Sequence, residues 1–512
     1  MFQAQVLWKY RYGSFADRFR YQYVISHSAE SLDGFHEHRL GGLYIYSGRA
    51  LPVREVHDSS GSNIGYVLGI AVGMKGNETT EPVKLPFKKS IKDFWGRFAS
   101  WLNDAAGRYA FVMDATGGPR LYTDPVGMIG AVYNPEDGFV ASSTYLAIKR
   151  PLRPNPKYDF DVIRNLGGKL SLFHTADEGV HRLNPSYYLD LTTFKSTRFW
   201  PGDLSFTPEP EDPTEVYREI IDTTRANIGA IAAAFPCSLP VSGGMDSRLL
   251  MAFAGDHLGK INQFYTHINN YATRRDAAIA AELCRVCNVE HEVHDRRKFG
   301  MARRDLRLTL RAYELTFGAP ASPPREYQNG VINGVPEGNV VLRAHQTDLL
   351  RAVYVFRPEA EWRDPEWQIE RLLIVPRAHF NQDVVDRFRD DFVAWQDTLP
   401  AAAMAKAADF MFLEVYYNAT VGAVFPALWR NFYMSPYNSR RLIALSLQFS
   451  ERRRRASEPV FELIEMMNQD LSMVPFDFEA PASLADKGEW SKGASSTRKR
   501  RDRTVEKLLS YS

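Results

Sequence analysis

A short segment near the middle of the chain combines glycines, hydroxyls and a carboxylate in a spacing that suits phosphate binding. It reads Leu239-Pro-Val-Ser242-Gly243-Gly244-Met245-Asp246-Ser247-Arg248. Such a turn directs backbone N–H groups to one spot at a helix N-terminus, and the hydroxyls of Ser242 and Ser247 would add donors for an anion. The glycines would leave room for the phosphate and tolerate positive φ. Asp246 beside a bound anion needs a cation between them, so Mg²⁺ is expected to bridge carboxylate and phosphate.

The same residues allow other interpretations. No lysine follows the glycines, so this is not the eight-residue phosphate loop that ends in Gly-Lys-Ser or Gly-Lys-Thr. The alternative without a ligand is a glycine turn that opens a helix, with Asp246 and Ser247 as its N-terminal caps. A preceding strand and a following helix favour nucleotide binding.

Strands and helices alternate around the loop and would position it. Apolar spacing predicts helices at Thr214–Ala234, Ser247–Leu258 and Arg275–Val286 and strands at Ser238–Val241 and Asn262–His267. This alternation is typical of a parallel sheet in an α/β domain. Residues 360–470 are expected to be mostly helical.

The first 200 residues are predicted to be rich in strands, with turn residues between them. The expected strands are Gln22–Ile25, Gly42–Tyr46, Val67–Val72, Tyr109–Met113 and Arg120–Tyr122. One helix is expected at Ile91–Leu102, where Phe94, Phe98 and Leu102 recur every four residues. The proline-rich and acidic stretch GDLSFTPEPEDP indicates a linker. The predicted organisation is therefore a domain at 1–203, a linker at 204–213 and a second domain at 214–512.

Composition excludes several classes of protein. The 512 residues are 45% hydrophobic and 24% charged, which is typical of globular domains, and 63 basic residues against 61 acidic ones give a net charge of +2. That balance provides no global attraction to nucleic acid or membrane. No apolar run approaches the roughly 18 residues of a membrane span, and the start is not typical of a signal peptide. Three cysteines indicate a reducing compartment, so a cytoplasmic protein is expected.

The glycine segment resembles the SGGxDS pyrophosphate loop of ATP pyrophosphatases, and the chain as a whole resembles the asparagine synthetase and β-lactam synthetase family. Further similarity lies in the order of several segments along about residues 1–500. These are Gly107-Arg-Tyr-Ala-Phe-Val, Leu121-Tyr-Thr-Asp124-Pro125, Ala141-Ser142-Ser143, Gly179-Val-His-Arg-Leu, Thr273-Arg-Arg-Asp-Ala and Ser435-Pro-Tyr-Asn-Ser.

The resemblance implies an N-terminal αββα sandwich of the Ntn type and a C-terminal parallel-sheet domain of the ATP-pyrophosphatase type, which is similar to adenine nucleotide alpha hydrolases. It also implies an ATP- and Mg²⁺-dependent ligase. Such an enzyme activates a carboxylate as an acyl-adenylate, releases AMP and pyrophosphate, and forms an amide with an amine. The loop from Ser242 to Ser247 would hold the pyrophosphate. The expected partners are small-molecule or peptide substrates, and a homodimer is compatible with the sequence.

The chain departs from the family at the glutaminase nucleophile. In the family an N-terminal cysteine attacks the glutamine amide, whereas position 2 here is Phe2 and the cysteines are Cys237, Cys284 and Cys287. The first domain is therefore predicted to keep its fold without hydrolysing glutamine. This favours a β-lactam synthetase or a peptide macrolactam cyclase type of reaction, which uses an amine in the substrate or free ammonia.

A second site segment is Val341-Leu-Arg343-Ala-His345-Gln-Thr347-Asp348. By resemblance Asp348 is the second Mg²⁺ ligand beside Asp246, and two carboxylates suit a hard cation. His345 stands where the family has Glu or Tyr, and it could accept a proton from the attacking amine or only satisfy a loop hydrogen bond. Ala344 and Gln346 replace two family glycines.

A glycine-rich stretch near the C-terminus resembles the lysine-bearing loop of β-lactam synthetases. Lys487 is the first candidate and Lys492 the second for stabilising charge on the acyl-adenylate; a solvated tail is the alternative. Glu414 is carried only as a guess for an acid near the site.

Other functions are weighed against these residues. Ala344 and Gln346 also allow a nucleotide-binding scaffold without turnover, and sulfur transfer onto RNA would need a reactive cysteine such as Cys237. Cys284, Cys287, His291 and His294 have the types of a zinc set, but a buried helix end is the preferred interpretation. The basic runs Arg452–Arg455 and Arg498–Arg503 are interpreted as solvated faces.

Overall fold

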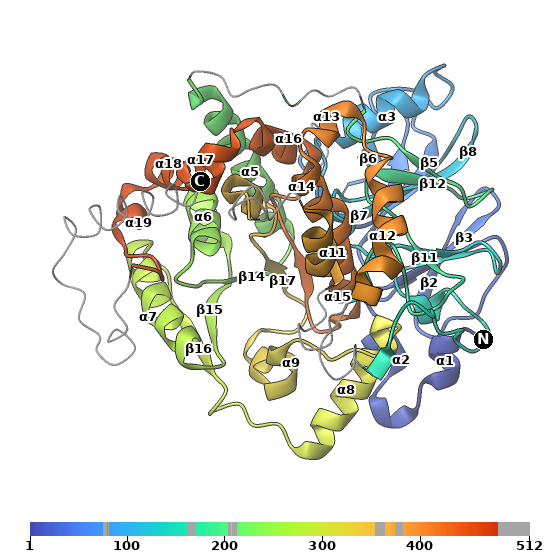
Figure 1. Ribbon diagram of the computed structural model, residues 1–512, viewed down its shortest axis with the longest axis horizontal. Coiled ribbons are helices and arrows are strands. Elements are labelled where there is room, and N and C mark those ends of the chain that lie inside the picture. The colour runs from blue at the N-terminus through green and yellow to red at the C-terminus, as the bar shows by residue number, and fades with distance from the viewer. Residues whose placement is uncertain are drawn as a thin grey trace. The chain divides into compact units, whose positions relative to one another are not determined.

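The computed structural model describes residues 1–74, 79, 81–161, 163, 169–202, 206, 212–353, 364–373 and 382–479. The chain divides into two compact units. Unit 1 comprises 1–205, 303–323 and 362–432, and unit 2 comprises 206–302, 324–361 and 433–512. The chain combines helices with β-sheets, one of which has parallel strands (Figure 1). This confirms the predicted α/β class. Most of the predicted linker, 204–213, lies outside the described residues.

Unit 1 contains two sheets whose strand pairs are antiparallel except for the parallel pair of β4 and β6. The first sheet has the order β11 (His181–Arg182), β9 (Val132–Asn134), β10 (Phe139–Ala141), β1 (Tyr23–Ser26), β3 (Leu43–Gly48) and β2 (Phe35–Leu40). The second has the order β13 (Ser196–Arg198), β12 (Tyr187–Asp190), β8 (Gly118–Thr123), β7 (Ala106–Ala115), β5 (Asn63–Val72), β4 (Val53–His57) and β6 (Val83–Lys84). All five predicted strands of this region therefore exist, with bounds shifted by a few residues.

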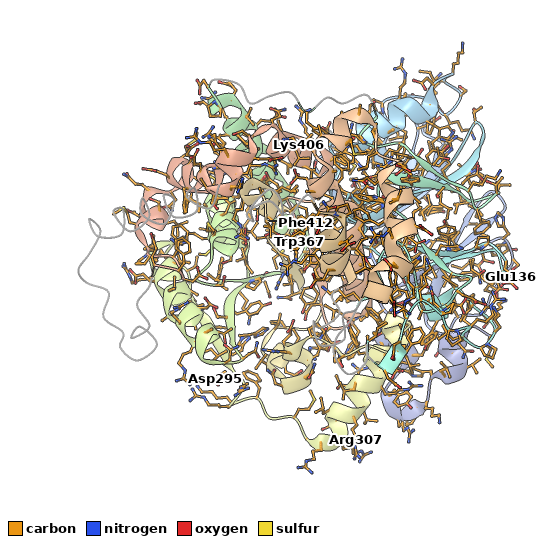
Figure 2. The ribbon with its side chains drawn as sticks, in the orientation of Figure 1. Glu136, Asp295, Arg307, Trp367, Lys406 and Phe412 are labelled. Atoms are coloured by element: carbon orange, nitrogen blue, oxygen red, sulfur yellow. The ribbon has the colours of Figure 1, made fainter. Side chains whose placement is uncertain are left out.

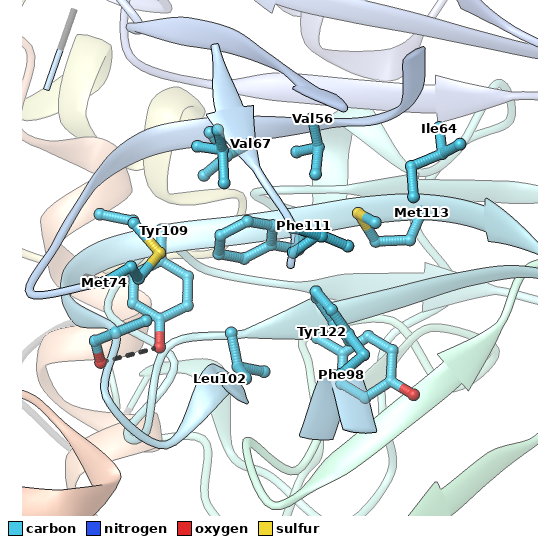
Figure 3. Close-up of a cluster of buried hydrophobic side chains, with 14 of the residues drawn as sticks. Val56, Ile64, Val67, Met74, Phe98, Leu102, Tyr109, Phe111, Met113 and Tyr122 are labelled. Atoms are coloured by element: carbon cyan, nitrogen blue, oxygen red, sulfur yellow. Dashed lines mark hydrogen bonds between the residues drawn. The ribbon is translucent and has the colours of Figure 1, made fainter. Parts of the chain in front are cut away.

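Helix α3 (Phe94–Leu102) packs one face against the second sheet. The spacing of four puts Phe94, Phe98 and Leu102 on one side of the helix, where all three are buried. They meet inward-facing side chains of the strands, including Phe111 and Tyr122, in one hydrophobic cluster (Figure 3). This packing fixes the second sheet of unit 1.

The remaining helical segments of unit 1 come from three separate parts of the chain. They are α1 (Gln3–Leu7), η1 (Tyr10–Tyr12), α2 (Phe15–Arg18), η2 (Thr144–Leu146), α8 (Arg303–Phe317), α11 (Pro365–Leu373), α12 (Gln382–Gln396), α13 (Ala401–Met404), α14 (Ala407–Phe410), the π-helix η7 (Met411–Tyr417), α15 (Val421–Val424) and η8 (Phe425–Ala427). Two of these parts, 303–323 and 362–432, lie beyond residue 213 in the sequence and belong to unit 1 by their contacts.

Unit 2 is built on a five-stranded sheet. Its order is β16 (Glu292–Asp295), β15 (Gln263–Ile268), β14 (Cys237–Pro240), β17 (Val340–Leu342) and β18 (Phe432–Met434), the last strand spanning the boundary between the units. β14 pairs in parallel with β15 and β17, and β15 pairs in parallel with β16. The carboxyl ends of these strands therefore share one edge of the sheet. Asp295, which is labelled in Figure 2, ends β16 there. Its Oδ2 accepts a hydrogen bond from Arg297 Nε at 2.9 Å.

Helices of unit 2 connect and flank these strands. They are α5 (Thr214–Ala234), α6 (Met245–Ala254), η3 (Gly255–Lys260), α7 (Tyr271–Val286), α9 (Arg325–Asn329), η4 (Val331–Gly334), η5 (Thr347–Arg351), α16 (Arg440–Gln448), α17 (Glu451–Arg455), α18 (Glu458–Met467) and α19 (Gln469–Met473). Helix α5 has the predicted bounds. Helix α6 ends four residues before the prediction because Gly255 adopts φ 47° and a 3₁₀ turn follows.

Candidate functional site

The glycine loop lies at the point where the chain order of the parallel sheet reverses. β14 is the central strand, and the sequence continues to β15 on one side and later to β17 on the other. In open α/β sheets, ligands bind outside the carboxyl ends of the strands at this switch point. Residues 241–244 connect the carboxyl end of β14 to α6, so the predicted loop occupies the position that the topology favours.

The loop is closed by hydrogen bonds between its own residues. The Ser242 N–H donates to Ser247 Oγ at 3.0 Å, the two hydroxyl oxygens are 2.9 Å apart, and the Gly244 N–H donates to Ser242 Oγ at 3.3 Å. The hydroxyls of Ser242 and Ser247 are therefore used within the loop, where they stabilise the turn. The first-turn amides of α6, on Met245 and Asp246, have no acceptor within a helix and are the groups such a turn presents to an anion.

The two glycines serve different spatial needs. Neither has positive φ, so the loop does not use the tolerance of glycine for a left-handed backbone. A Cβ on Gly243 would lie 2.6 Å from Ile279 Cδ1 and 3.1 Å from Asp276 Oδ1, whereas a Cβ on Gly244 would have only Ser242 Oγ, at 3.5 Å, within 4 Å. Protein side chains therefore crowd Gly243, whereas Gly244 borders open space.

Asp246 and Asp348 come together across the sheet edge. Arg351 Nη2 donates to Asp246 Oδ2 at 2.7 Å and to Asp348 Oδ1 at 2.8 Å, and the Thr347 hydroxyl donates to Asp246 Oδ1 at 3.1 Å. Burial and the charge of Asp348 raise the pKa of Asp246 to about 6, against the opposing effect of Arg351 and Thr347. Two carboxylates that converge on one cationic nitrogen form an oxygen donor set that fits a hard divalent cation.

The turn after β17 places Asp348. The Arg343 N–H donates to Met434 O at 2.7 Å, and the Ser435 hydroxyl donates to His345 O at 2.8 Å, which ties the turn to β18 and the residues after it. Gln346 adopts φ 70° as the N-cap of η5, although it stands where the family has glycine. A residue with a side chain adopts this left-handed backbone at a cost of about 1 kcal/mol. Asp348 then falls in the first turn of η5.

His345 is held as a neutral imidazole. Burial, together with the positive charge of Arg343, lowers its pKa to about 3. The ring is therefore available as an acceptor at neutral pH, but it would hold a proton there only if an anion came close enough to raise this pKa. Arg343 itself forms no ion pair with any carboxylate in the described part of the chain.

The sequence analysis did not identify the residues that form hydrogen bonds to the backbone of the loop or anchor the helix that follows it. The Gly243 N–H bonds to the carboxylate of Asp276, whose pKa is raised by burial and by the charge of Asp477, and the Asp477 N–H donates to Gly243 O at 3.0 Å. Arg248, in the first half of α6, is fully buried and binds the carbonyls of Leu471, Val474 and Pro475. Arg248 is part of the loop motif, and an arginine in an apolar helix was the available signal.

The three other candidate residues, Lys487, Lys492 and Glu414, have separate outcomes. Lys487 and Lys492 lie outside the described residues. The Glu414 carboxylate is fully buried in unit 1 and accepts four hydrogen bonds, from Arg198 Nη1 and Nη2, Asn184 and Trp395. A carboxylate with four donors in a closed cluster is a structural group, so the guess that Glu414 is an acid of the site is not supported.

Unit 1 contains no cysteine, and Phe2 near its start takes part in packing. Phe2 is buried with its ring centroid 5.0 Å from that of Phe139. Just before β1, the fully buried amide of Gln22 accepts from Ser142 Oγ at 3.1 Å and Ser143 Oγ at 2.7 Å. The three cysteines of the chain all lie in unit 2. Unit 1 therefore offers no thiol for attack on an amide.

The discounted motifs are explained by local contacts. Burial raises the pKa of the Cys284 thiol to about 12, and His291 Nε2 lies 2.9 Å from Thr266 Oγ1. Within the described ranges no group of three or more His, Cys, Asp or Glu side chains could hold a metal. In the run Arg452–Arg455, Arg454 is buried and donates to Leu349 O at 3.1 Å, so that run is not wholly a solvated face. The run Arg498–Arg503 lies outside the described residues.

Among the described helices, none combines the length and apolar character needed to cross a membrane. A parallel sheet with a glycine loop and a pair of carboxylates at its switch point is the arrangement in which open α/β sheets bind ligands. The asparagine synthase family model matches residues 228–454, and the chain therefore carries a domain of that family, which indicates an ATP-dependent amide-forming ligase of the asparagine synthetase type. The matched range includes parts of both compact units. No curated protein matches the chain.

Proposed function

We propose that this protein is a glutamine-independent ligase that activates a carboxylate with ATP as an acyl-adenylate and joins it to an amine. AMP and pyrophosphate are the other products. The observation that carries this proposal is the convergence of Asp246 and Asp348 beside the glycine loop, within a domain of the asparagine synthase family. The β-lactam synthetase and peptide macrolactam cyclase reactions are the subtypes that fit best.

The chain's residues divide the work of binding ATP. The amides of Met245 and Asp246 at the start of α6 bind the outer phosphates, assisted by the helix dipole. Asp246 and Asp348 hold Mg²⁺, which when bound neutralises phosphate charge and favours departure of pyrophosphate. Ser242 and Ser247 keep the loop in the shape that exposes the amides. Asp276 binds the Gly243 N–H of this loop, and Arg248 anchors α6 through its bond to the Pro475 carbonyl.

His345 and Lys487 are the residues proposed for proton transfer and charge stabilisation. His345 is neutral at physiological pH, and an acyl-adenylate phosphate beside it would raise its low pKa toward the value a base needs. Lys487 is proposed to stabilise the developing negative charge, as the glycine-rich sequence around it indicates.

The lack of glutamine hydrolysis rests on the contents of unit 1. A glutaminase of this family needs a nucleophilic thiolate, and the three cysteines of the sequence all lie in unit 2. The proposed nitrogen donor is therefore an amine in the substrate itself or free ammonia.

The test is incubation of the full chain with ATP, Mg²⁺ and pools of carboxylate substrates that carry an amine, with AMP measured by chromatography and products by mass spectrometry. The proposal predicts AMP and a product lighter by one water, neither of which is stimulated by glutamine. An Asp348→Asn variant is the matched control and is expected to lose AMP formation. Formation of ADP instead of AMP, or stimulation by glutamine, contradicts the proposal.

A second candidate function is a nucleotide-binding scaffold. It is favoured by one observation, that Gln346 and Ala344 stand in place of two glycines at the second site segment. Tight ATP binding with no AMP from any carboxylate pool would select it.

A further inference from the structure

A single side chain holds the two carboxylates of the candidate metal site together. One nitrogen, Arg351 Nη2, lies 2.7 Å from Asp246 Oδ2 and 2.8 Å from Asp348 Oδ1. These three side chains are 21–31% exposed, so solvent screens them only in part. A cation ligated by both acids would have to occupy the same space as this guanidinium nitrogen.

The arginine is built into the site by the local helix. Arg351 follows Asp348 by three residues on η5, so the two side chains meet on one face of the turn. The helix itself is anchored, because Leu349 and Leu350 are buried and Arg454 Nη1 donates to Leu349 O at 3.1 Å. Any displacement of the guanidinium is therefore a movement of the Arg351 side chain rather than of the helix.

We propose that Arg351 is an internal counter-ion of the site, which occupies the divalent-cation position between Asp246 and Asp348 until nucleotide and metal bind together. Two neighbouring carboxylates repel each other and need a positive charge between them. In the nucleotide-free protein Arg351 provides it. When metal replaces it, the guanidinium is released beside the glycine loop, where its planar donors suit phosphate oxygens.

The consequence is coupled binding. Metal alone must break two charge-assisted hydrogen bonds to enter, so the free protein binds divalent cations weakly. Metal with nucleotide gains phosphate ligands and gives the displaced arginine a new partner, so its affinity rises. This inference rests on the proposed function only in assigning the metal to Asp246 and Asp348.

The experiment is titration of the full-length protein with Mn²⁺, followed by electron paramagnetic resonance of the free ion, with and without α,β-methylene-ATP. Arg351→Met is expected to bind Mn²⁺ at least tenfold more tightly than the wild type in the absence of nucleotide. Arg343→Met is the matched control, because it removes an equal charge from the same turn without removing a contact to either carboxylate. It is expected to change Mn²⁺ affinity by less than threefold.

The outcomes separate this inference from the proposed function. Equal or weaker Mn²⁺ binding by Arg351→Met, or a similar gain in both variants, overturns the inference while AMP formation by the wild type is unaffected. Failure of Mn²⁺ to bind any form with nucleotide counts against the proposed function as well. If thermal melting shows that Arg351→Met does not fold, the test is the Mn²⁺ affinity of the wild type with and without the nucleotide analogue. The nucleotide analogue must then tighten Mn²⁺ binding at least tenfold, and an unchanged affinity overturns the inference.

Discussion

Substituting alanine for each glycine of the loop separates a packing role from a ligand role. The Cβ of Gly243→Ala would lie 2.6 Å from Ile279 Cδ1 and 3.2 Å from Asp477 Cβ, so the isoleucine and the loop must move apart. Overpacking costs about 1–3 kcal/mol, and the lower end, about 1 kcal/mol, applies here because the closest atom is the end of a side chain that can shift. Gly243→Ala is therefore expected to lower the free energy of unfolding by that amount and to weaken ATP binding through the distorted loop.

Gly244→Ala should behave in the opposite way. Gly244 has φ −78° and ψ 177°, an extended conformation that alanine adopts freely, and its Cβ would have 3.5 Å to the closest atom, Ser242 Oγ. The reduced freedom of the unfolded chain should then leave stability unchanged or raise it by about 0.4–1 kcal/mol. The added methyl group would occupy the space assigned to phosphate, so we expect at least tenfold weaker ATP binding, about 1.4 kcal/mol.

The assays are urea unfolding for the free energy of unfolding and isothermal titration calorimetry with ATP and Mg²⁺ for affinity. The two variants are each other's control, because they make the same chemical change one residue apart. If Gly244→Ala binds ATP as tightly as the wild type, the loop does not hold the phosphates. If Gly243→Ala is as stable as the wild type, the packing argument for that glycine is wrong.

Three further predictions concern other parts of the chain. Glu414→Gln should destabilise unit 1 by about 1.5–3 kcal/mol because the largely buried Arg198 would lose its charged partner. Glu215→Gln, in an exposed pair, should cost less than about 0.5 kcal/mol in urea unfolding. Similar losses in both variants would contradict the structural role of Glu414. Although burial opposes the shift, the Arg150 guanidinium and two backbone N–H groups lower the pKa of Asp177. The contribution of Asp177 to stability should therefore be complete above its ordinary pKa near 3.9 and be lost as pH falls through the lowered value. In pH-dependent melting, Asp177→Asn should reduce the loss of stability between these two values. Burial raises the pKa of all three cysteine thiols to about 11 or 12. Iodoacetamide at pH 8 should therefore leave them unmodified in the native protein by mass spectrometry, and rapid alkylation with loss of AMP formation would indicate thiol chemistry instead.

Local sequence patterns predicted the elements around the loop because each carries its own signal. The apolar spacing of Thr214–Ala234 belongs to one continuous helix, and the observed α5 has the same bounds. Helix α7 begins at Tyr271 rather than at Arg275 because Asn270 caps it, with its side chain accepting from the Thr273 N–H at 3.0 Å. Short strands such as β11 and β13 have two or three residues, too few to show an alternating pattern.

Long-range contacts could not be predicted in this way. The segments 303–323 and 362–432 contribute helices to unit 1, although they follow the glycine loop in the sequence. Their membership depends on contacts such as those of Glu414 with Arg198 and Asn184, which no periodicity contains. The resemblance placed Asp348 beside Asp246, and the structure brings both to one nitrogen of Arg351. Arg351 itself could be found only once η5 was known to be a 3₁₀ turn.

The most direct test of the central claim is a crystal structure of the full chain with α,β-methylene-ATP and Mn²⁺, using the anomalous signal of manganese to locate the ion. We expect a manganese peak bonded to carboxylate oxygens of Asp246 and Asp348. The outer phosphates should lie on the amides of Met245 and Asp246, and Arg351 should be turned away from both acids. A nucleotide bound elsewhere, or Arg351 still bridging the two acids with nucleotide in place, would contradict it.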